Sequence, residues 1–498
     1  MTTMNSTLGQ LWAGVAKVDI TAPAAAASDD PLGARIDPST NDDRLYAKAL
    51  VLKSVTVTVV IVTLDAVAIA EIGTIGNDYL ALVRGRLHEN LGLDPQNVLI
   101  NVSHCHGVVC KDIEARTVRA VEEAWQNLVP VSVGVGSGHE DRIMENRRLK
   151  LKNGREADVR RAYALAPDEQ VAAIGPVDPQ IGILRLDRED GRTLAVVFNF
   201  ACHPIQGVPS GGNSADLSGF ASRVIEDHSS PGTVAFFLQG CGADINPVLY
   251  KDVDHPADAE PLGNLLGLST LRALRTIETT ATGPLKLINE TLALPRADLA
   301  PHINALEAEQ RRLLQSLQGT SLNLKTFIPL LVKYRLGGDF PSYASHRYLH
   351  EQSLGRDGLS KLDAANRKNI DQYTANIYIM EELTRIQTNL TLVKKNQALN
   401  LAAGTTTIAV EVLGLRLGDF VLITFPGELP VQIGLDIKRR SPHPFTFVAG
   451  VTNGYIYYTP TVQQLENLGG AQEDSDCLLA PEWQSIFRAK VAAILRRL

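Results

Sequence analysis

The amino-acid sequence predicts an α/β fold: a mixed β-sheet body flanked by helices, with a helical insertion. Short, continuous apolar runs alternate with amphipathic helical runs from about residue 12 to residue 285, which is typical of buried strands covered by helices. Residues 296–398 instead form long, charged runs with helical spacing, and strand character returns afterwards. We therefore expect one α/β body, built from residues 12–295 and 399–498, that a helical insertion interrupts at 296–398.

One apolar stretch inside the insertion, residues 326–340 (TFIPLLVKYRLGGDF), carries basic residues and a Gly-Gly pair. We expect it to belong to a linker between two long helices. It could face a substrate as a lid or touch a membrane, but packing of the insertion onto the body is the favoured interpretation. His346 and His350 lack the glutamate of the HExxH zinc motif and indicate a solvated helix.

Composition excludes several classes of protein. The chain has 498 residues, of which 45% are hydrophobic and 21% charged, and its net charge is -7. This balance offers no basic surface for nucleic acid, and no apolar run reaches the roughly 18 residues that span a bilayer. We therefore expect no nucleic-acid partner and no stable membrane insertion, and we leave a homo-oligomer open. Five sparse cysteines and an N-terminus without a signal-peptide pattern predict a cytoplasmic protein.

Five of the apolar runs end in residues that can bind a metal or move a proton. Ligands of open α/β sheets bind beyond the strand ends, so we expect these residues to share a pocket. Two histidines and a carboxylate from separate strands suit a catalytic zinc site. In His104-Cys105-His106, side chains two apart on a strand would share one face. The residues are Asp65, His104 with His106, His203, Asp244 and Glu428.

The order of five motifs resembles the neutral/alkaline ceramidase family of zinc-dependent amidases. The resemblance runs from AGVAKVDITAP to the tyrosine motif and is weakest in the insertion. It implies that zinc is bound by His104, His203, Glu428 and Tyr455, and that a small molecule with an N-acyl (amide) bond is the substrate. The motifs are SHCH (103–106), NFACHP (199–204), LQGCGADINP (238–247), FPGE (425–428) and NGYIYYTPT (453–461).

The resemblance also assigns supporting roles around the zinc. His106 would assist catalysis at the scissile amide as a general acid or base. Arg147, in ENRR, matches a substrate-contacting arginine of the family. We expect Asp244 to orient His106 or a zinc-bound histidine, with Asp65 as a weaker candidate. Zinc-activated water would then attack the amide carbonyl.

One departure from the family bears on the substrate. Asn246 stands where ceramidases carry a serine with an assigned catalytic role, and Gly107-Val108-Val109 replaces their Ser-Gly-Pro. Asparagine cannot accept an acyl group, although its amide can donate a hydrogen bond to an oxyanion. We therefore expect an amide substrate other than ceramide.

Three alternatives stay open at this point. Cys241, on a Gly-rich turn after a strand, could serve a metal-free thiol hydrolase. A zinc-binding pseudoenzyme would keep the ligands without the reaction. A biosynthetic zinc enzyme would use the same site for amide formation or acyl transfer, which sequence cannot separate from hydrolysis.

Overall fold

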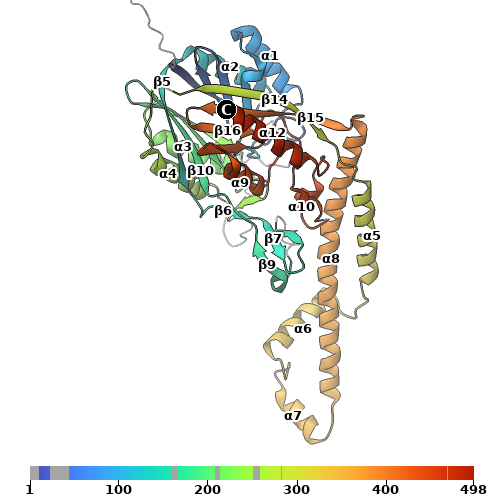
Figure 1. Cartoon of the computed structure of the whole chain (residues 1–498). Helices are drawn as coiled ribbons and strands as arrows, with labels where there is room; N and C mark the ends of the chain where they lie inside the picture. Colours follow the sequence, from blue (N-terminus) through green and yellow to red (C-terminus); the bar gives the residue numbers. More distant parts are fainter. Residues whose placement is uncertain are drawn as a thin grey trace, which may run out of the picture.

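The computed structural model describes most of the chain, and it confirms the predicted mixed α/β architecture. Figure 1 shows a body of sheets and helices from which a long helical arm projects. The described residues are 10–22, 44–159, 166–207, 213–248, 250, 258–281, 283–467 and 469–498.

A large sheet of eight strands forms the centre of the body, in the order β12-β11-β10-β5-β1-β2-β3-β4. Its neighbours pair antiparallel, except that β3–β4 and β11–β12 pair parallel. The continuous apolar runs of the sequence form these strands because both faces of the sheet are covered. The strands are β1 (Leu11–Asp19), β2 (Tyr46–Lys53), β3 (Thr58–Leu64), β4 (Val98–Val102), β5 (Val129–His139), β10 (Gln180–Arg188), β11 (Thr193–Phe200) and β12 (Val234–Gln239).

A second sheet of four strands packs face to face against the first. The strands β14 (Leu285–Pro295), β15 (Thr407–Leu417), β16 (Phe420–Thr424) and β17 (Phe445–Ala449) lie in that order, with β16 and β17 parallel. Side chains of both sheets share one core, in which Phe236 of β12 and Phe447 of β17 are fully buried. A Cβ atom at Gly182 of β10 would lie 2.3 Å from the Phe447 ring, so glycine is what allows this close contact between the sheets.

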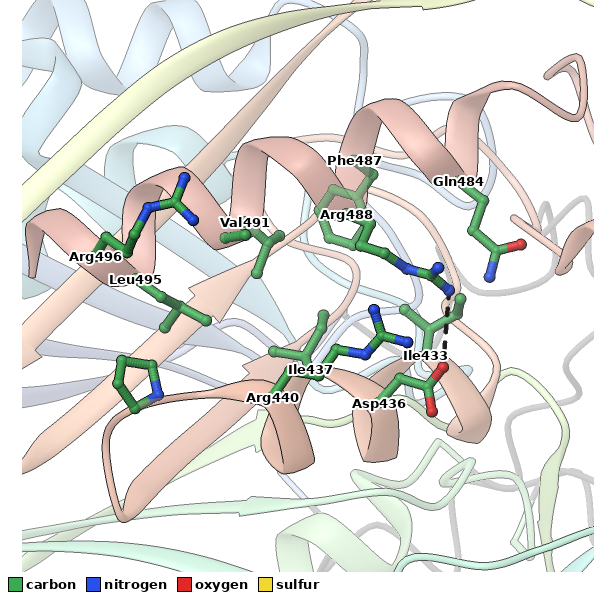
Figure 2. Close-up of a pocket in the computed structure, with 12 residues that line it drawn as sticks. Ile433, Asp436, Ile437, Arg440, Gln484, Phe487, Arg488, Val491, Leu495 and Arg496 are labelled. Atoms are coloured by element: carbon green, nitrogen blue, oxygen red, sulfur yellow. Dashed lines mark ion pairs between the residues drawn. The ribbon is translucent and has the colours of Figure 1, made fainter.

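Helices cover the outer faces of both sheets, which gives four layers. The large sheet is covered by α1 (Tyr79–Leu91), α2 (Ile113–Gln126), α3 (Asp216–Asp227) and α4 (Glu260–Leu274). The small sheet is covered by α9 (Val431–Arg440) and α12 (Trp483–Arg497). A groove of about 280 Å³ lies between α9 and α12, where Asp436 and Arg488 form an ion pair (Figure 2).

Short elements complete the body. Two small sheets pair β6 (Met144–Asn146) with β13 (Ile245–Pro247), and β7 (Arg148–Leu151) with β8 (Glu156–Asp158) and β9 (Val171–Ile174). The remaining helices of the body are η3 (Pro95–Asn97), η5 (Asp168–Gln170), α10 (Val462–Leu465) and α11 (Gln472–Ser475).

The two edges of the large sheet meet, although β4 and β12 are its first and last strands. The backbone N–H of Gln239, at the end of β12, donates to Asn101 Oδ1 of β4 over 3.1 Å. Asn101 Nδ2 donates in turn to the Gly450 carbonyl oxygen over 2.8 Å and to Thr452 Oγ1 over 2.9 Å. This fully buried amide therefore joins the ends of β4 and β12 to the loop after β17. The ends of strands far apart in the sheet order converge on one side.

The arm consists of α5 (Ala300–Ser316), α6 (Leu324–Leu336), α7 (Ser345–Ser353) and α8 (Gly358–Ala402). At 45 residues, α8 is about 68 Å long, and α6 and α7 lie at its far end (Figure 1). The division into domains at 296 and 398 stays a prediction, since α8 itself continues to Ala402.

The stretch 326–340 differs from the expectation of a linker. Most of it is the helix α6, and it packs on α8 of the arm, away from the body (Figure 1). The physical reason is that Phe327 and Tyr334, seven residues apart, share one helical face and form a small core with Ile370 of α8. His346 and His350 are exposed on α7, as a solvated helix predicts.

None of the helices in the described part of the chain is both long and apolar enough to cross a membrane.

Candidate metal centre

His104, His203 and Glu428 come together in the structure from loops that follow β4, β11 and β16. All three are buried, and the atoms that could ligate a metal lie within 4.8 Å of one another. Tyr455, from the loop after β17, donates its hydroxyl to Glu428 Oε1 over 2.5 Å. Its ring stacks on His104 with 6.3 Å between centroids. The four residues that the resemblance nominated as zinc ligands therefore form one cluster.

The local backbone around His104 differs from the strand that we expected. β4 ends at Val102, and His104 has a left-handed φ of 66°, so the alternation of side chains along a strand does not apply. Non-glycine residues in this region carry strain, which concentrates at functional sites. His104 and His106 are nevertheless neighbours, with ring centroids 5.8 Å apart, because the loop turns after the strand. His106 is half-buried.

Backbone carbonyls orient both clustered histidines. His104 Nδ1 lies 2.6 Å from the carbonyl oxygen of Val67, and His203 Nδ1 lies 3.2 Å from that of Ile245. Since a carbonyl oxygen only accepts hydrogen bonds, each ring carries a proton on Nδ1. In a neutral ring, Nε2 then presents a lone pair. The two Nε2 atoms face the Glu428 carboxylate, at 3.0 Å for His203 and 3.5 Å for His104.

This arrangement brings acceptors face to face. Burial, with the nearby Arg147 charge, lowers the pKa of His203 to about 4, so the ring is neutral near pH 7. Burial alone would raise the pKa of Glu428, but the two histidines hold it well below its usual value. A carboxylate and an imidazole nitrogen at 3.0 Å attract each other only when a proton or a metal cation lies between them. The donor set, two imidazole nitrogens and a carboxylate with a phenol beside it, fits a zinc ion.

Asp244 does not make the contact that we expected of it. Its Oδ1 accepts a hydrogen bond from the backbone N–H of Val431 over 2.8 Å, at the start of α9, and its Oδ2 accepts one from Asn146 over 3.3 Å. Burial raises its pKa. Asp244 hydrogen-bonds neither His106 nor a clustered histidine, because the first turn of α9 takes up its carboxylate.

Asp65 has a similarly structural position. It accepts a hydrogen bond from the Tyr46 backbone N–H over 2.9 Å, and burial raises its pKa to about 6. The Asp65 carboxylate therefore binds the end of β3 to the start of β2.

Arg147 and Asn246 form a buried pair beside the cluster. Arg147 is 1% exposed, and its Nη1 donates to Asn246 Oδ1 over 3.1 Å. Its Nε lies 2.7 Å from Glu473 Oε1, and its Nη2 donates to the Ala243 carbonyl oxygen and to Tyr458. Since a guanidinium only donates, the amide oxygen of Asn246 must face Arg147. The role of Arg147 as a substrate contact stays a prediction.

The Nδ2 atom of Asn246 can therefore donate a hydrogen bond to another group. This atom is buried and has no hydrogen-bond partner among the described residues. An unpaired buried N–H donor costs about 1–3 kcal/mol, which points to a ligand that accepts from it.

Cys241 is unsuited to a role as a nucleophile. It belongs to the core under α9, where a Cβ atom at Gly434 would lie 2.8 Å from its Sγ. Burial raises the pKa of its thiol above the usual range, which disfavours the reactive thiolate. All five cysteines are free and buried. The thiol-hydrolase alternative therefore loses its support.

Three further residues shape the site, and sequence reasoning did not select them. Asn101 joins strand ends, and its signal was a polar residue in the middle of the apolar run VLINV. Tyr458 and Glu473 hold Arg147, and only Tyr458 lay in a motif. Glu473 carried no sequence signal, because its partner lies more than 300 positions away.

Comparisons with known proteins agree with this geometry at the level of the fold. No protein-family model matches the sequence, and no curated protein matches it. Among solved structures, the neutral ceramidase from Pseudomonas aeruginosa is similar, with a TM-score of 0.59, 16% identity, and coverage of 98% of this chain and 75% of that chain. A structure of a ceramidase complexed with C2 gives a TM-score of 0.60 and 17% identity, with the same coverage. The chain therefore has the fold of the neutral ceramidases.

Proposed function

We propose that the protein is a zinc-dependent amide hydrolase that cleaves the N-acyl bond of a small molecule other than ceramide. Its fold, shared with ceramidases, supports hydrolase activity in general. The observation that carries the proposal is the buried cluster in which two imidazole Nε2 atoms face the Glu428 carboxylate. A bound metal cation would stabilise this grouping of side chains.

His104, His203, Glu428 and Tyr455 would hold the zinc. When bound, zinc supplies a Lewis acid and lowers the pKa of a coordinated water to about 7. The carbonyls of Val67 and Ile245 keep both imidazole rings in the tautomer that leaves Nε2 free. The Tyr455 hydroxyl, hydrogen-bonded to Glu428, fixes the carboxylate in place.

His106 is the residue of this site best placed to move protons. Its ring lies 5.8 Å from that of His104, centroid to centroid, and it is less buried than the clustered histidines. A histidine at this position can take a proton from the attacking water and give one to the leaving amine.

Asn246 supports direct hydrolysis without an acyl-enzyme. The Arg147 guanidinium holds its amide oxygen, so Nδ2 is directed away as a donor. A preorganised donor of this kind stabilises the negative charge that develops on a carbonyl oxygen.

The loss of the family serine and of the Ser-Gly-Pro segment argues for an amide other than ceramide. Amide formation would use the same groups in reverse and is the alternative reaction. We place the protein in the cytoplasm.

Metal analysis of the purified protein, together with an assay on a panel of N-acyl amines and N-acyl amino acids, tests the proposal. We expect about one zinc per chain and release of free amine, and we expect His104→Ala to lose both. The matched control is His346→Ala, which changes an exposed histidine on α7 and should keep both. Full zinc occupancy in His104→Ala would contradict the assignment of the centre.

A further inference from the structure

The tip of the helical arm, residues 324–371, exposes a row of aliphatic side chains. Leu324, Ile328, Val332 and Leu336 of α6 are 61%, 48%, 50% and 85% exposed. Their spacing of four residues places them in one stripe along the helix. Single exposed aliphatic residues are common on protein surfaces, but a continuous row marks an interaction site.

The stripe is a second apolar face of α6. The first face is already used, since Phe327 and Tyr334 are buried against Ile370 of α8. The Phe327 ring stacks on Tyr373 with 4.3 Å between centroids, and the Tyr334 hydroxyl donates to Asp363 over 2.6 Å. The helix is thus anchored to the arm without the stripe, and packing of α6 does not explain the exposed residues.

The charge of the arm tip is opposite to that of the whole protein. The helix α6 contains Lys325, Lys333 and Arg335 and no acidic residue. Residues 324–371 hold eight Lys and Arg against five Asp and Glu, whereas the whole chain has a net charge of -7. Three of the five acids are engaged within the tip: Asp363 by Tyr334, Glu351 by the Leu359 backbone N–H, and Asp357 by Lys361. The solvent face of α6 is therefore apolar and cationic.

Further apolar side chains of the arm tip, outside α6, are exposed. Tyr343, Leu349 and Leu354 are 104%, 57% and 51% exposed. The Phe340 and Tyr348 rings, 5.3 Å apart, join the segment after α6 to α7. Tyrosine is a residue that concentrates at the boundary between lipid and water.

We propose that the arm tip is a docking surface for an anionic lipid bilayer, with α6 lying in the plane of the interface. The aliphatic stripe would enter the boundary between headgroups and acyl chains, while the Lys and Arg side chains reach the lipid phosphates. Such a helix lies on a membrane and does not span it. Two copies of the cationic tip would repel each other, so the charge favours lipid over a second copy.

Because α8 is long, the arm tip lies far from the body of the protein. The helix has 45 residues, about 68 Å, and the tip lies at its far end from the body (Figure 1). Docking through the tip would therefore hold the protein at a membrane with its body away from the lipid. The proposal does not depend on the reaction at that centre.

Sedimentation of the purified full chain with lipid vesicles tests the proposal. The probes are vesicles of phosphatidylcholine alone and vesicles that also contain phosphatidylserine, at low and at high salt. We expect the protein to bind the serine-containing vesicles at least tenfold more tightly, and to lose most of this preference at high salt. Equal binding to both vesicles, or no binding to either, would overturn the proposal.

Two double variants separate the apolar and the charged contributions. Ile328→Gln with Val332→Gln should weaken binding at least tenfold. Lys325→Gln with Lys333→Gln should weaken it by about thirtyfold at low salt, since each surface cation contributes about 1 kcal/mol. The matched controls are Leu401→Gln, at an exposed leucine at the other end of α8 (71% exposed), and Lys150→Gln with Lys152→Gln on the body.

The controls should bind as the unaltered protein does. All variants change exposed side chains, so the far-UV circular dichroism spectrum should stay unchanged and shows that the chain is folded. Undiminished vesicle binding by the Ile328→Gln, Val332→Gln variant would overturn the proposal. So would a concentration-dependent dimer that this variant alone abolishes, because the stripe would then bind a second copy.

Discussion

The metal centre and the arm tip are the two regions for which we propose a function, and they are built in opposite ways. The centre gathers His104, His203 and Glu428 from three loops that are about 100 or more residues apart in sequence, and it buries them. The tip uses side chains within one helix and exposes them. A centre of this kind depends on many distant hydrogen bonds, whereas the tip depends on local helical periodicity. Substitutions should therefore have large effects at the first region and separable, additive effects at the second.

The largest expected effect comes from Glu428→Gln. The amide keeps the shape of the side chain but removes the charge that holds a cation between the two imidazoles. We expect loss of zinc and a fall in amide hydrolysis of at least about a thousandfold, measured by metal analysis and steady-state kinetics. Glu482→Gln, at an exposed glutamate, is the control. Vesicle binding through the arm tip should not change. If Glu428→Gln lost both amide hydrolysis and vesicle binding, the two regions would not be independent.

A second variant, Asn101→Ala, tests whether the centre depends on the meeting of sheet edges. It leaves the buried Gln239 N–H without its acceptor and removes the donors to Gly450 and Thr452. We expect the free energy of unfolding to fall by about 2–4 kcal/mol, measured by urea denaturation, and zinc to bind more weakly. Asn153→Ala, on an exposed turn, should stay within about 0.5 kcal/mol. Unchanged stability of Asn101→Ala would show that other contacts hold the edges together.

Asn246 separates catalysis from metal binding. Asn246→Ala should keep its zinc and lose about a hundredfold in kcat, the usual effect of removing one oxyanion donor. Asn246→Asp keeps an oxygen towards Arg147 but has no donor, so it should lose a similar factor. If Asn246→Asp stays active while Asn246→Ala does not, the residue only positions Arg147. Asn246→Ser should have at most weak ceramidase activity, and robust cleavage of a fluorescent ceramide would contradict the proposed substrate class.

The smallest expected effect is a pH dependence of stability that belongs to the centre alone. The pKa of His203 is lowered to about 4 in the folded, metal-free chain, below the ordinary value near 6.5. The unfolded chain therefore binds the proton first, and stability is lost as the pH falls from about 6.5 towards 4. Between pH 7 and pH 5 the chelated protein should lose about 1–2 kcal/mol in urea denaturation. His203→Gln should remove this part of the slope, and an unchanged slope would contradict the assignment.

Much of the architecture could be predicted from the sequence because its signals are local. Continuous apolar runs such as AVVFNFA marked strands, and helical spacing marked the insertion. The ordered motifs nominated His104, His203, Glu428 and Tyr455, which the structure brings into one cluster. The prediction of a linker at 326–340 was wrong, because its aromatic residues at i and i+7 pack one face of the helix α6 onto α8, in spite of the Gly-Gly pair.

The fold class and the apolar, cationic pattern of α6 follow from composition and from periods of two to four residues. The site residues were nominated by the order of the motifs in the sequence. Three contacts arise only in the folded chain: β4 and β12 meet through Asn101, Asp244 binds the start of α9, and Arg147 binds the amide oxygen of Asn246. These contacts join residues about 100 or more positions apart, and burial sets the pKa of His203. A local sequence pattern predicts neither which distant residues come into contact nor how deeply a side chain is buried.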